Sequence, residues 1–128
     1  MPEEVTILED LSIIRVDSYG VVTQEDLIGS MREVSRIHRE RGLTRVLVDA
    51  TRETSLPSTF PLYEFGSDLA RALRAVRFAL VPAPDLKEDL TFLETVAINR
   101  GLEVEIFDSV PDAIQRLTQE GEGQGETQ

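Results

Sequence analysis

The chain has 128 residues, the length of a single domain, and its 41% content of hydrophobic residues is enough to bury a core, which excludes wholesale disorder. The absence of cysteine excludes disulfides and thiolate chemistry, and the single histidine, His38, excludes a multi-histidine metal site. Thirteen basic residues against 24 acidic ones give a net charge of −11, the wrong sign for binding nucleic acid or an anionic membrane surface.

The first elements predicted from the sequence are a β-hairpin and a long helix. Two short apolar runs, Thr6–Leu8 and Leu11–Val16, flank an acidic pair and predict the hairpin. Thr23 is a good N-cap residue, and Asp26 three positions later approximates a capping box. Apolar residues then recur with a helical period, and Gly42 is expected to end the helix in the left-handed conformation that glycine favours.

A strand, a loop and a second helix are predicted next. The segment Arg45–Asp49 (RVLVD) is an apolar run typical of a strand that is covered on both faces. The polar stretch Ala50–Ser58 predicts a loop. Thr59 is expected to cap the following helix, and Pro61 is compatible with its first turn.

The rest of the chain alternates strands and helices in the same way. Val76–Val81 predicts a strand, and either Asp85 or Asp89 is expected to open a third helix. Val104–Phe107 predicts the last strand, and Ser109 is expected to cap a closing helix.

The order of these elements predicts an α/β fold with a mixed sheet. Strands separated by single helices are parallel neighbours in a helix-covered sheet, and the leading hairpin adds an antiparallel edge. We therefore expect about five strands and about four helices in one domain spanning residues 1–118. Residues 119–128 (QEGEGQGETQ) hold three glycines and no apolar residue, and we expect a disordered tail there.

Several segments occur in a familiar order behind the leading hairpin: GVVTQEDL, RVLVDAT, RFALV and FLETVAINRGLEVEIFDSVPDAIQRL. This pattern, from Val5 to Leu117, resembles the SpoIIAA-like superfamily, the STAS domains of anti-sigma-factor antagonists, and particularly its bacterial branch of uncharacterised stand-alone domains. The resemblance implies a SpoIIAA-like fold and a non-enzymatic module that binds a partner protein or a small ligand. Regulatory members are switched by phosphorylation of a serine after the strand that matches Val46–Asp49. Here that segment reads DATRETS and lacks the Asp-Ser-x-Gly pattern, so no switch residue is carried over.

The segment after the Val46–Asp49 strand is the first candidate site. Ligands and partners of open α/β sheets bind at the carboxyl ends of the strands. The interaction surface that we predict there consists of Asp49, Thr51, Ser55, Ser58, Phe60 and Tyr63. Its expected partners are a second copy of the chain, giving a homodimer, or a regulatory protein. The alternative is structural: the polar residues serve as turn and cap residues, and Phe60 packs onto the following helix as a staple.

Two further polar groupings have competing interpretations. Asp85, Glu88, Asp89 and Asp108 also follow strands and could form, with Asp49, a polar rim that holds a divalent cation. The alternative is that they cap turns and helices, and the sequence has no EF-hand or HExxH spacing to support a metal. His38 near a helix end complements the helix dipole more simply than it serves as a general base, so an enzyme that uses Asp49 with His38 is disfavoured.

The alternative function to a protein-interaction module is binding of a small molecule or lipid in an apolar pocket between sheet and helices, as in related CRAL-TRIO-type folds. A cavity lined by Phe65, Leu69, Phe78 and Phe92 would favour it. The glycines are isolated and form no phosphate cradle, so no cofactor is expected. No stretch approaches the roughly 20 apolar residues of a membrane span, and we expect a soluble, cytoplasmic protein without membrane insertion.

Overall fold

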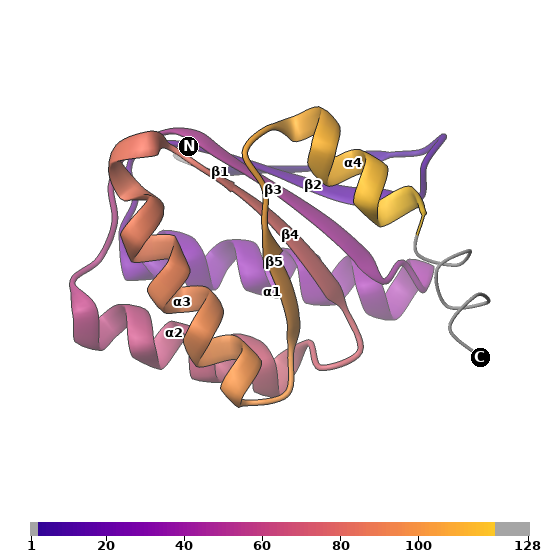
Figure 1. The fold of residues 1–128 in the computed structure, drawn as a ribbon. Helices are drawn as coiled ribbons and strands as arrows, with labels where there is room; N and C mark the ends of the chain where they lie inside the picture. Colours follow the sequence, from indigo (N-terminus) through magenta and orange to yellow (C-terminus); the bar gives the residue numbers. More distant parts are fainter. Residues whose placement is uncertain (1–2, 120–128) are drawn as a thin grey trace.

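Five strands form one sheet in chain order in the computed structural model, which describes residues 3–119, and four α-helices pack on that sheet (Figure 1). The elements are β1 Glu3–Leu8, β2 Ile13–Val21, α1 Gln24–Arg41, β3 Arg45–Ser55, α2 Thr59–Ala72, β4 Arg77–Pro82, a 3-10 turn Pro84–Leu86, α3 Lys87–Asn99, β5 Glu103–Ile106 and α4 Val110–Thr118. The predicted tail lies outside the described residues, apart from Gln119.

The sheet is mixed, as predicted. β1 runs antiparallel to β2, with Val5 opposite Val16, and β2, β3, β4 and β5 are parallel neighbours. Helices α1, α2 and α3 cover one face of the sheet, and α4 lies alone on the other face (Figure 1). The α/β fold class, the leading hairpin and the parallel strands that follow it are therefore confirmed.

Both faces of β3 are buried along its first half. Val46 belongs to the larger core, between the sheet and α1–α3, and Leu47 belongs to the smaller core under α4; both are fully buried. The guanidinium of Arg45 donates hydrogen bonds to the carbonyl oxygens of Leu117, at 2.9 Å, and Leu11, at 2.8 Å. These bonds tie the end of α4 to the β1–β2 turn.

The predicted caps of α1 are confirmed. The Thr23 hydroxyl accepts from the backbone N–H of Asp26 at 3.1 Å, and the Asp26 carboxylate accepts from the Thr23 N–H at 2.9 Å. Gly42 follows the helix with φ of 71°, a conformation that residues with a Cβ rarely adopt. At α2 the predicted cap is off by one residue: Ser58 holds the N-cap position and Thr59 is the first helical residue.

The predicted Ala50–Ser58 loop is wrong over most of its length, because β3 continues to Ser55. β2 is also longer than predicted and keeps pairing with β3, with Gly20 opposite Glu53. The register shifts between Asp17 and Tyr19, as a bulge requires. The extension carries polar side chains that find partners on β2, which a pattern based on apolar residues cannot reveal.

The remaining boundaries differ from prediction by a few residues. α3 begins at Lys87, after the 3-10 turn, and β5 ends at Ile106. None of the helices within residues 3–119 has the length and apolar character needed to cross a membrane.

Candidate functional site

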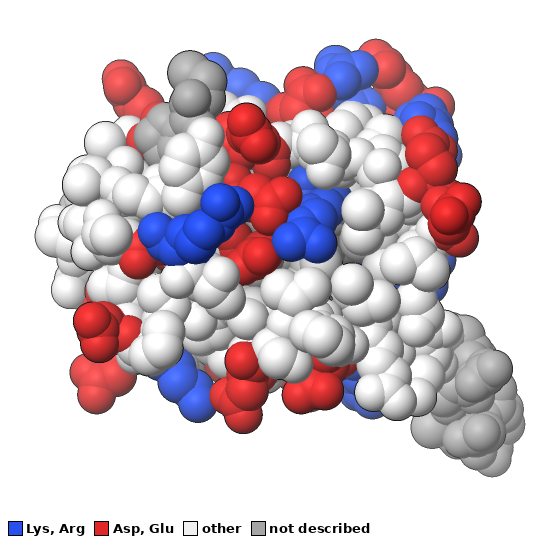
Figure 2. Space-filling model, turned by 90° about the horizontal axis from the view of Figure 1, so that it is seen from above, with Lys and Arg blue, Asp and Glu red and all other residues white. Residues whose placement is uncertain are grey.

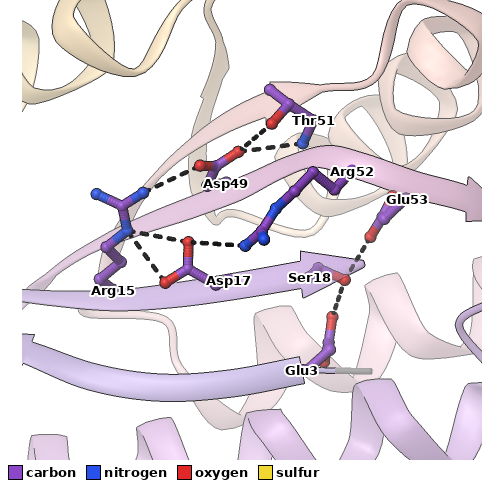
Figure 3. A network of polar contacts seen from close by, with 8 residues as sticks. All are labelled: Glu3, Arg15, Asp17, Ser18, Asp49, Thr51, Arg52 and Glu53. Carbon is purple, nitrogen blue, oxygen red and sulfur yellow. Dashed lines mark hydrogen bonds and ion pairs between the residues drawn. The ribbon is translucent and has the colours of Figure 1, made fainter. Parts of the chain in front are cut away.

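A cluster of charged side chains occupies the part of the sheet that shares its face with α4. The Arg15 guanidinium donates to both carboxylate oxygens of Asp17, at 3.1 and 3.2 Å, and to Asp49 at 3.0 Å (Figure 3). The strand alternation explains the grouping: Arg15 and Asp17 lie two residues apart on β2, and Asp49 lies opposite Asp17 on β3.

Asp49, the first predicted site residue, already uses both of its carboxylate oxygens. One accepts from Arg15, and the other accepts from the Thr51 backbone N–H at 3.1 Å and from the Thr51 hydroxyl at 2.7 Å. The predicted pair Asp49 and Thr51 is thus in direct contact, with Asp49 only 9% exposed. These contacts hold the bulged part of β3 in place.

Arg52 completes the cluster at its exposed side. Its guanidinium lies 4.0 Å from Asp17 and 5.3 Å from the centre of the Tyr19 ring, a distance typical of a cation–π contact. Figure 2 shows that blue and red side chains are interleaved at the centre of this face, with uncharged surface around them. The cluster therefore presents no extended patch of one sign.

The other predicted site residues lie where β3 gives way to α2. Ser55 ends β3, where its carbonyl oxygen accepts from the Val22 N–H at 2.9 Å, and Ser58 is exposed at the N-cap of α2 without a side-chain capping bond. Phe60 and Tyr63 follow in the first turns of α2. The structure thus pairs Asp49 with Thr51, and Phe60 with Tyr63.

Phe60 and Tyr63 form an exposed aromatic pair. Phe60 is 66% exposed and Tyr63 is 37% exposed, and their rings stack with centres 6.4 Å apart. The Arg100 guanidinium lies 5.5 Å from the Tyr63 ring centre and donates a hydrogen bond to its hydroxyl. Val21, 62% exposed, lies at the same end of the sheet, opposite Ser55. Phe60 is therefore a surface residue and not a staple onto the helix. We call Phe60 and Tyr63 the aromatic patch.

A second polar cluster, which sequence reasoning missed, lies on the opposite face of the sheet. Ser18 on β2 is fully buried between two glutamates, with its hydroxyl 2.7 Å from Glu3 on β1 and 2.7 Å from Glu53 on β3 (Figure 3). We call Glu3 and Glu53 the carboxyl pair, and Ser18 is the serine that bridges them. Ser18 interrupts an otherwise apolar alternation on β2, and that was the available signal in the sequence.

The burial of this cluster changes its acid–base chemistry. The pKa of Glu53 is raised to about 7. Burial is the main cause, the charge of Glu3 adds to it, and the hydrogen bond from Ser18 opposes it. The pKa of Glu3 is also raised, first by burial and then by the charge of Asp26, against hydrogen bonds with Ser30 and Ser18 that lower it. A serine hydroxyl carries one proton, so it can donate to only one of the two carboxylates. The contact of the serine oxygen with the other carboxyl is a hydrogen bond when that carboxyl is protonated and donates to it.

The carboxyl pair lines the edge of an apolar cavity of about 70 Å³ between the sheet and helices α1–α3. Phe65, Leu69 and Phe78 line this cavity, as the small-molecule alternative requires. Phe92, the fourth residue named for it, packs against the core without lining the cavity.

The residues of the predicted acidic rim do not gather into a metal site within the described part of the chain, and the histidine has a local partner. Lys87 lies 3.5 Å from Asp108, and the acidic residues at the start of α3 are exposed. No group of three or more metal-binding side chains occurs within the described part of the chain. The Nδ1 atom of His38 lies 2.8 Å from the Leu43 carbonyl oxygen, to which its N–H donates, while the oxygens of Asp49 are engaged by Arg15 and Thr51. A pairing of His38 with Asp49 is not formed.

The fold is found again in solved structures. No family model matches the sequence, and no curated protein matches it. The anti-sigma factor antagonist SpoIIAA in its unphosphorylated form is 14% identical and superposes with a TM-score of 0.61, over 90% of this chain and 96% of that one. The phosphorylated form of SpoIIAA from Bacillus is also 14% identical, with a TM-score of 0.60 over 90% and 98% of the two chains.

A third solved structure shares the fold and has no assigned function. It is an uncharacterised protein of the DUF3478 family from Shewanella loihica PV-4, 18% identical, with a TM-score of 0.61 over 90% of this chain and 91% of that one. Its authors describe its fold as SpoIIAA-like. At identities this low, the superpositions establish a shared architecture and not a shared activity. The chain described here has the SpoIIAA-like fold.

Proposed function

We propose that the protein is a non-catalytic regulatory module of the STAS type, which works as a homodimer through the aromatic patch at the start of α2. The fold supports the class of module, because the similar structures include an anti-sigma factor antagonist, SpoIIAA, solved in unphosphorylated and phosphorylated forms. A regulatory protein that docks on the same surface of the dimer is the further partner that this proposal allows.

The observation that carries the proposal is the exposure of Phe60 and Tyr63 on a rigid element. Two aromatic rings stacked on the first turns of a helix are held in place before any partner binds, so little side-chain entropy is lost on association. Aromatic residues and arginine are enriched at protein interfaces, and here Arg100 lies against Tyr63. Val21 is a further exposed apolar side chain, at the end of β2 opposite Ser55.

The non-catalytic assignment is supported by how the polar groups are used. The carboxylate of Asp49 is bound by Arg15 and Thr51, which leaves it no free oxygen with which to activate a substrate. His38 donates to a backbone carbonyl of its own helix end. These contacts account for both residues as structural groups.

Sedimentation velocity of the full chain tests the dimer. We expect the wild type to sediment as a dimer and the Phe60→Ala/Tyr63→Ala double variant as a monomer with an unchanged far-UV spectrum, because both side chains lie on the surface. The matched control is Ile98→Ala, which removes another exposed hydrophobic side chain, on α3, and should leave the dimer intact. A monomeric wild type, or a double variant that remains dimeric, would overturn the proposal.

A second candidate function, binding of a small molecule between the sheet and the helices, is favoured by the interior cavity. Its volume of about 70 Å³ is far below the roughly 300 Å³ at which pockets for drug-sized ligands begin. The size supports a ligand of a few heavy atoms and does not support a lipid.

A further inference from the structure

Glu53 places an unsatisfied acceptor in the wall of the apolar cavity. The residue is 6% exposed, and one of its carboxylate oxygens lies 2.7 Å from the Ser18 hydroxyl. The other oxygen, Oε1, is buried without a hydrogen-bond partner. A buried carboxylate oxygen without a donor is unfavourable, so this atom is a position where a bound molecule with an N–H or O–H group would be stabilised.

An acidic groove shares the side chain of Glu3 with this cavity. A groove between β1 and α1 is lined by Glu3, Glu25, Asp26 and Glu33 together with Val5, Gly29 and Ser30, a set that contains no lysine or arginine. Arg36 pairs with Glu33, Asp26 caps α1 and Ser18 contacts Glu3, so Glu25 is the least compensated carboxylate of the groove. Negatively charged side chains that line a groove attract a cation.

The groove and the cavity share two of their lining residues. Glu3 and Ser30 line both, so the acidic groove and the apolar cavity adjoin at these two residues. Beyond the carboxyl pair, aliphatic and aromatic side chains of α1, α2, α3 and the sheet line the space, Leu27, Val34, Leu69 and Leu93 among them. The site therefore has a polar, anionic end and an apolar end.

Both ends together define the ligand. The geometry points to a binding site for a small primary ammonium compound, whose charged nitrogen lies between Glu3 and Glu53 and whose short aliphatic chain fills the cavity. The volume of about 70 Å³ limits the chain to about three carbons, because a cavity of about 150 Å³ binds benzene, which has six. This inference rests on the second candidate function and does not depend on the dimer.

A divalent metal ion fits the site less well. Calcium takes six to eight oxygen ligands, whereas two carboxylates and the hydroxyl of Ser18 are gathered at this point. The apolar walls would also exclude the water molecules that magnesium retains.

The test is an NMR titration of the full-length protein with n-propylammonium chloride, at ionic strength matched with sodium chloride. A parallel titration with n-propanol supplies the same chain without the charge, and one with tetramethylammonium supplies a charge without N–H donors. The variants are Glu53→Gln, and Glu3→Gln on the edge strand should Glu53→Gln not fold. Glu4→Gln is the matched control, because Glu4 is the exposed neighbour of Glu3 on β1.

We expect n-propylammonium to shift the resonances of Ser18, Glu53 and the cavity methyl groups, and to bind more tightly than n-propanol or tetramethylammonium. Loss of one charge-assisted hydrogen bond in Glu53→Gln should weaken n-propylammonium binding by at least about tenfold, and Glu4→Gln should leave it unchanged. Equal affinity for n-propanol, or undiminished affinity in Glu53→Gln and Glu3→Gln, would overturn the ammonium site while leaving the cavity as a ligand site. No shift with any of the three compounds would overturn both.

Discussion

The buried carboxyl of Glu53 predicts an unusual dependence of stability on pH. In the unfolded chain the pKa of Glu53 is about 4.5, and in the native state burial raises it to about 7. Between these two values the native protein binds more protons than the unfolded chain, so the free energy of unfolding falls as the pH rises. Stability from this group is fully present below about pH 4.5 and is lost as the pH passes about 7. At about 1.4 kcal/mol for each pH unit, the full loss is about 3 kcal/mol.

Urea denaturation followed by far-UV circular dichroism at pH values from 5 to 8 measures this loss. The groups that act on the Glu53 carboxyl are Glu3 on β1 and the Ser18 hydroxyl on β2, and Asp26 on α1 acts on Glu3 in turn. In Glu53→Gln the amide cannot ionise, so most of the decline should disappear and the variant should exceed the wild type in stability at pH 8. Glu4→Gln should decline as the wild type does. A flat wild-type profile, or a Glu53→Gln profile as steep as that of the wild type, would refute the reasoning.

Three further substitutions test the packing and the polar contacts. Gly66→Ala should lower the free energy of unfolding by up to about 2 kcal/mol, because crowding of the added Cβ, 3.0 Å from side chains of α3, costs about 1–3 kcal/mol and the better helix propensity of alanine returns about 1 kcal/mol; a raised urea midpoint would contradict this. Arg45→Met should cost about 1–3 kcal/mol by removing two hydrogen bonds to carbonyls, and should raise amide hydrogen exchange in α4 but not in α1. Asp49→Asn should lower the urea midpoint and leave the oligomeric state unchanged, because Asp49 contacts Arg15 and Thr51. Loss of the dimer at unchanged stability would instead place Asp49 in the interface.

The order of the elements could be predicted because local patterns determine it. The continuous apolar run of Val46, Leu47 and Val48 marks a strand buried on both faces, and Thr23 with Asp26 marks the start of α1. Each of these signals lies within a few residues of the chain, so no knowledge of distant contacts is needed.

The second half of β3 could not be predicted because its stability is non-local. Thr51 and Glu53 are polar and read as a loop, yet their partners are Asp49 and, across the sheet, Ser18. A buried glutamate becomes recognisable only once a serine 35 positions away is placed opposite it.

The candidate surface could be predicted only in part. Phe60 and Tyr63 were singled out, but whether a ring in the first turns of a helix faces the core or the solvent depends on how that helix is rotated against the sheet. The size of the cavity likewise depends on how side chains of the sheet and of three helices pack together, and no spacing in the sequence encodes it.

The proposed homodimer is tested most directly by a distance between its two copies. The chain contains no cysteine, so a single spin label at Ser58→Cys reports only on distances between protomers. Ser58 precedes Phe60 at the start of α2, whereas Gln115 lies on α4, on the opposite face of the sheet. Double electron–electron resonance should give a shorter and narrower distance from a label at Ser58 than from one at Gln115→Cys. No dipolar coupling at either position, or a shorter distance at Gln115, would contradict the account.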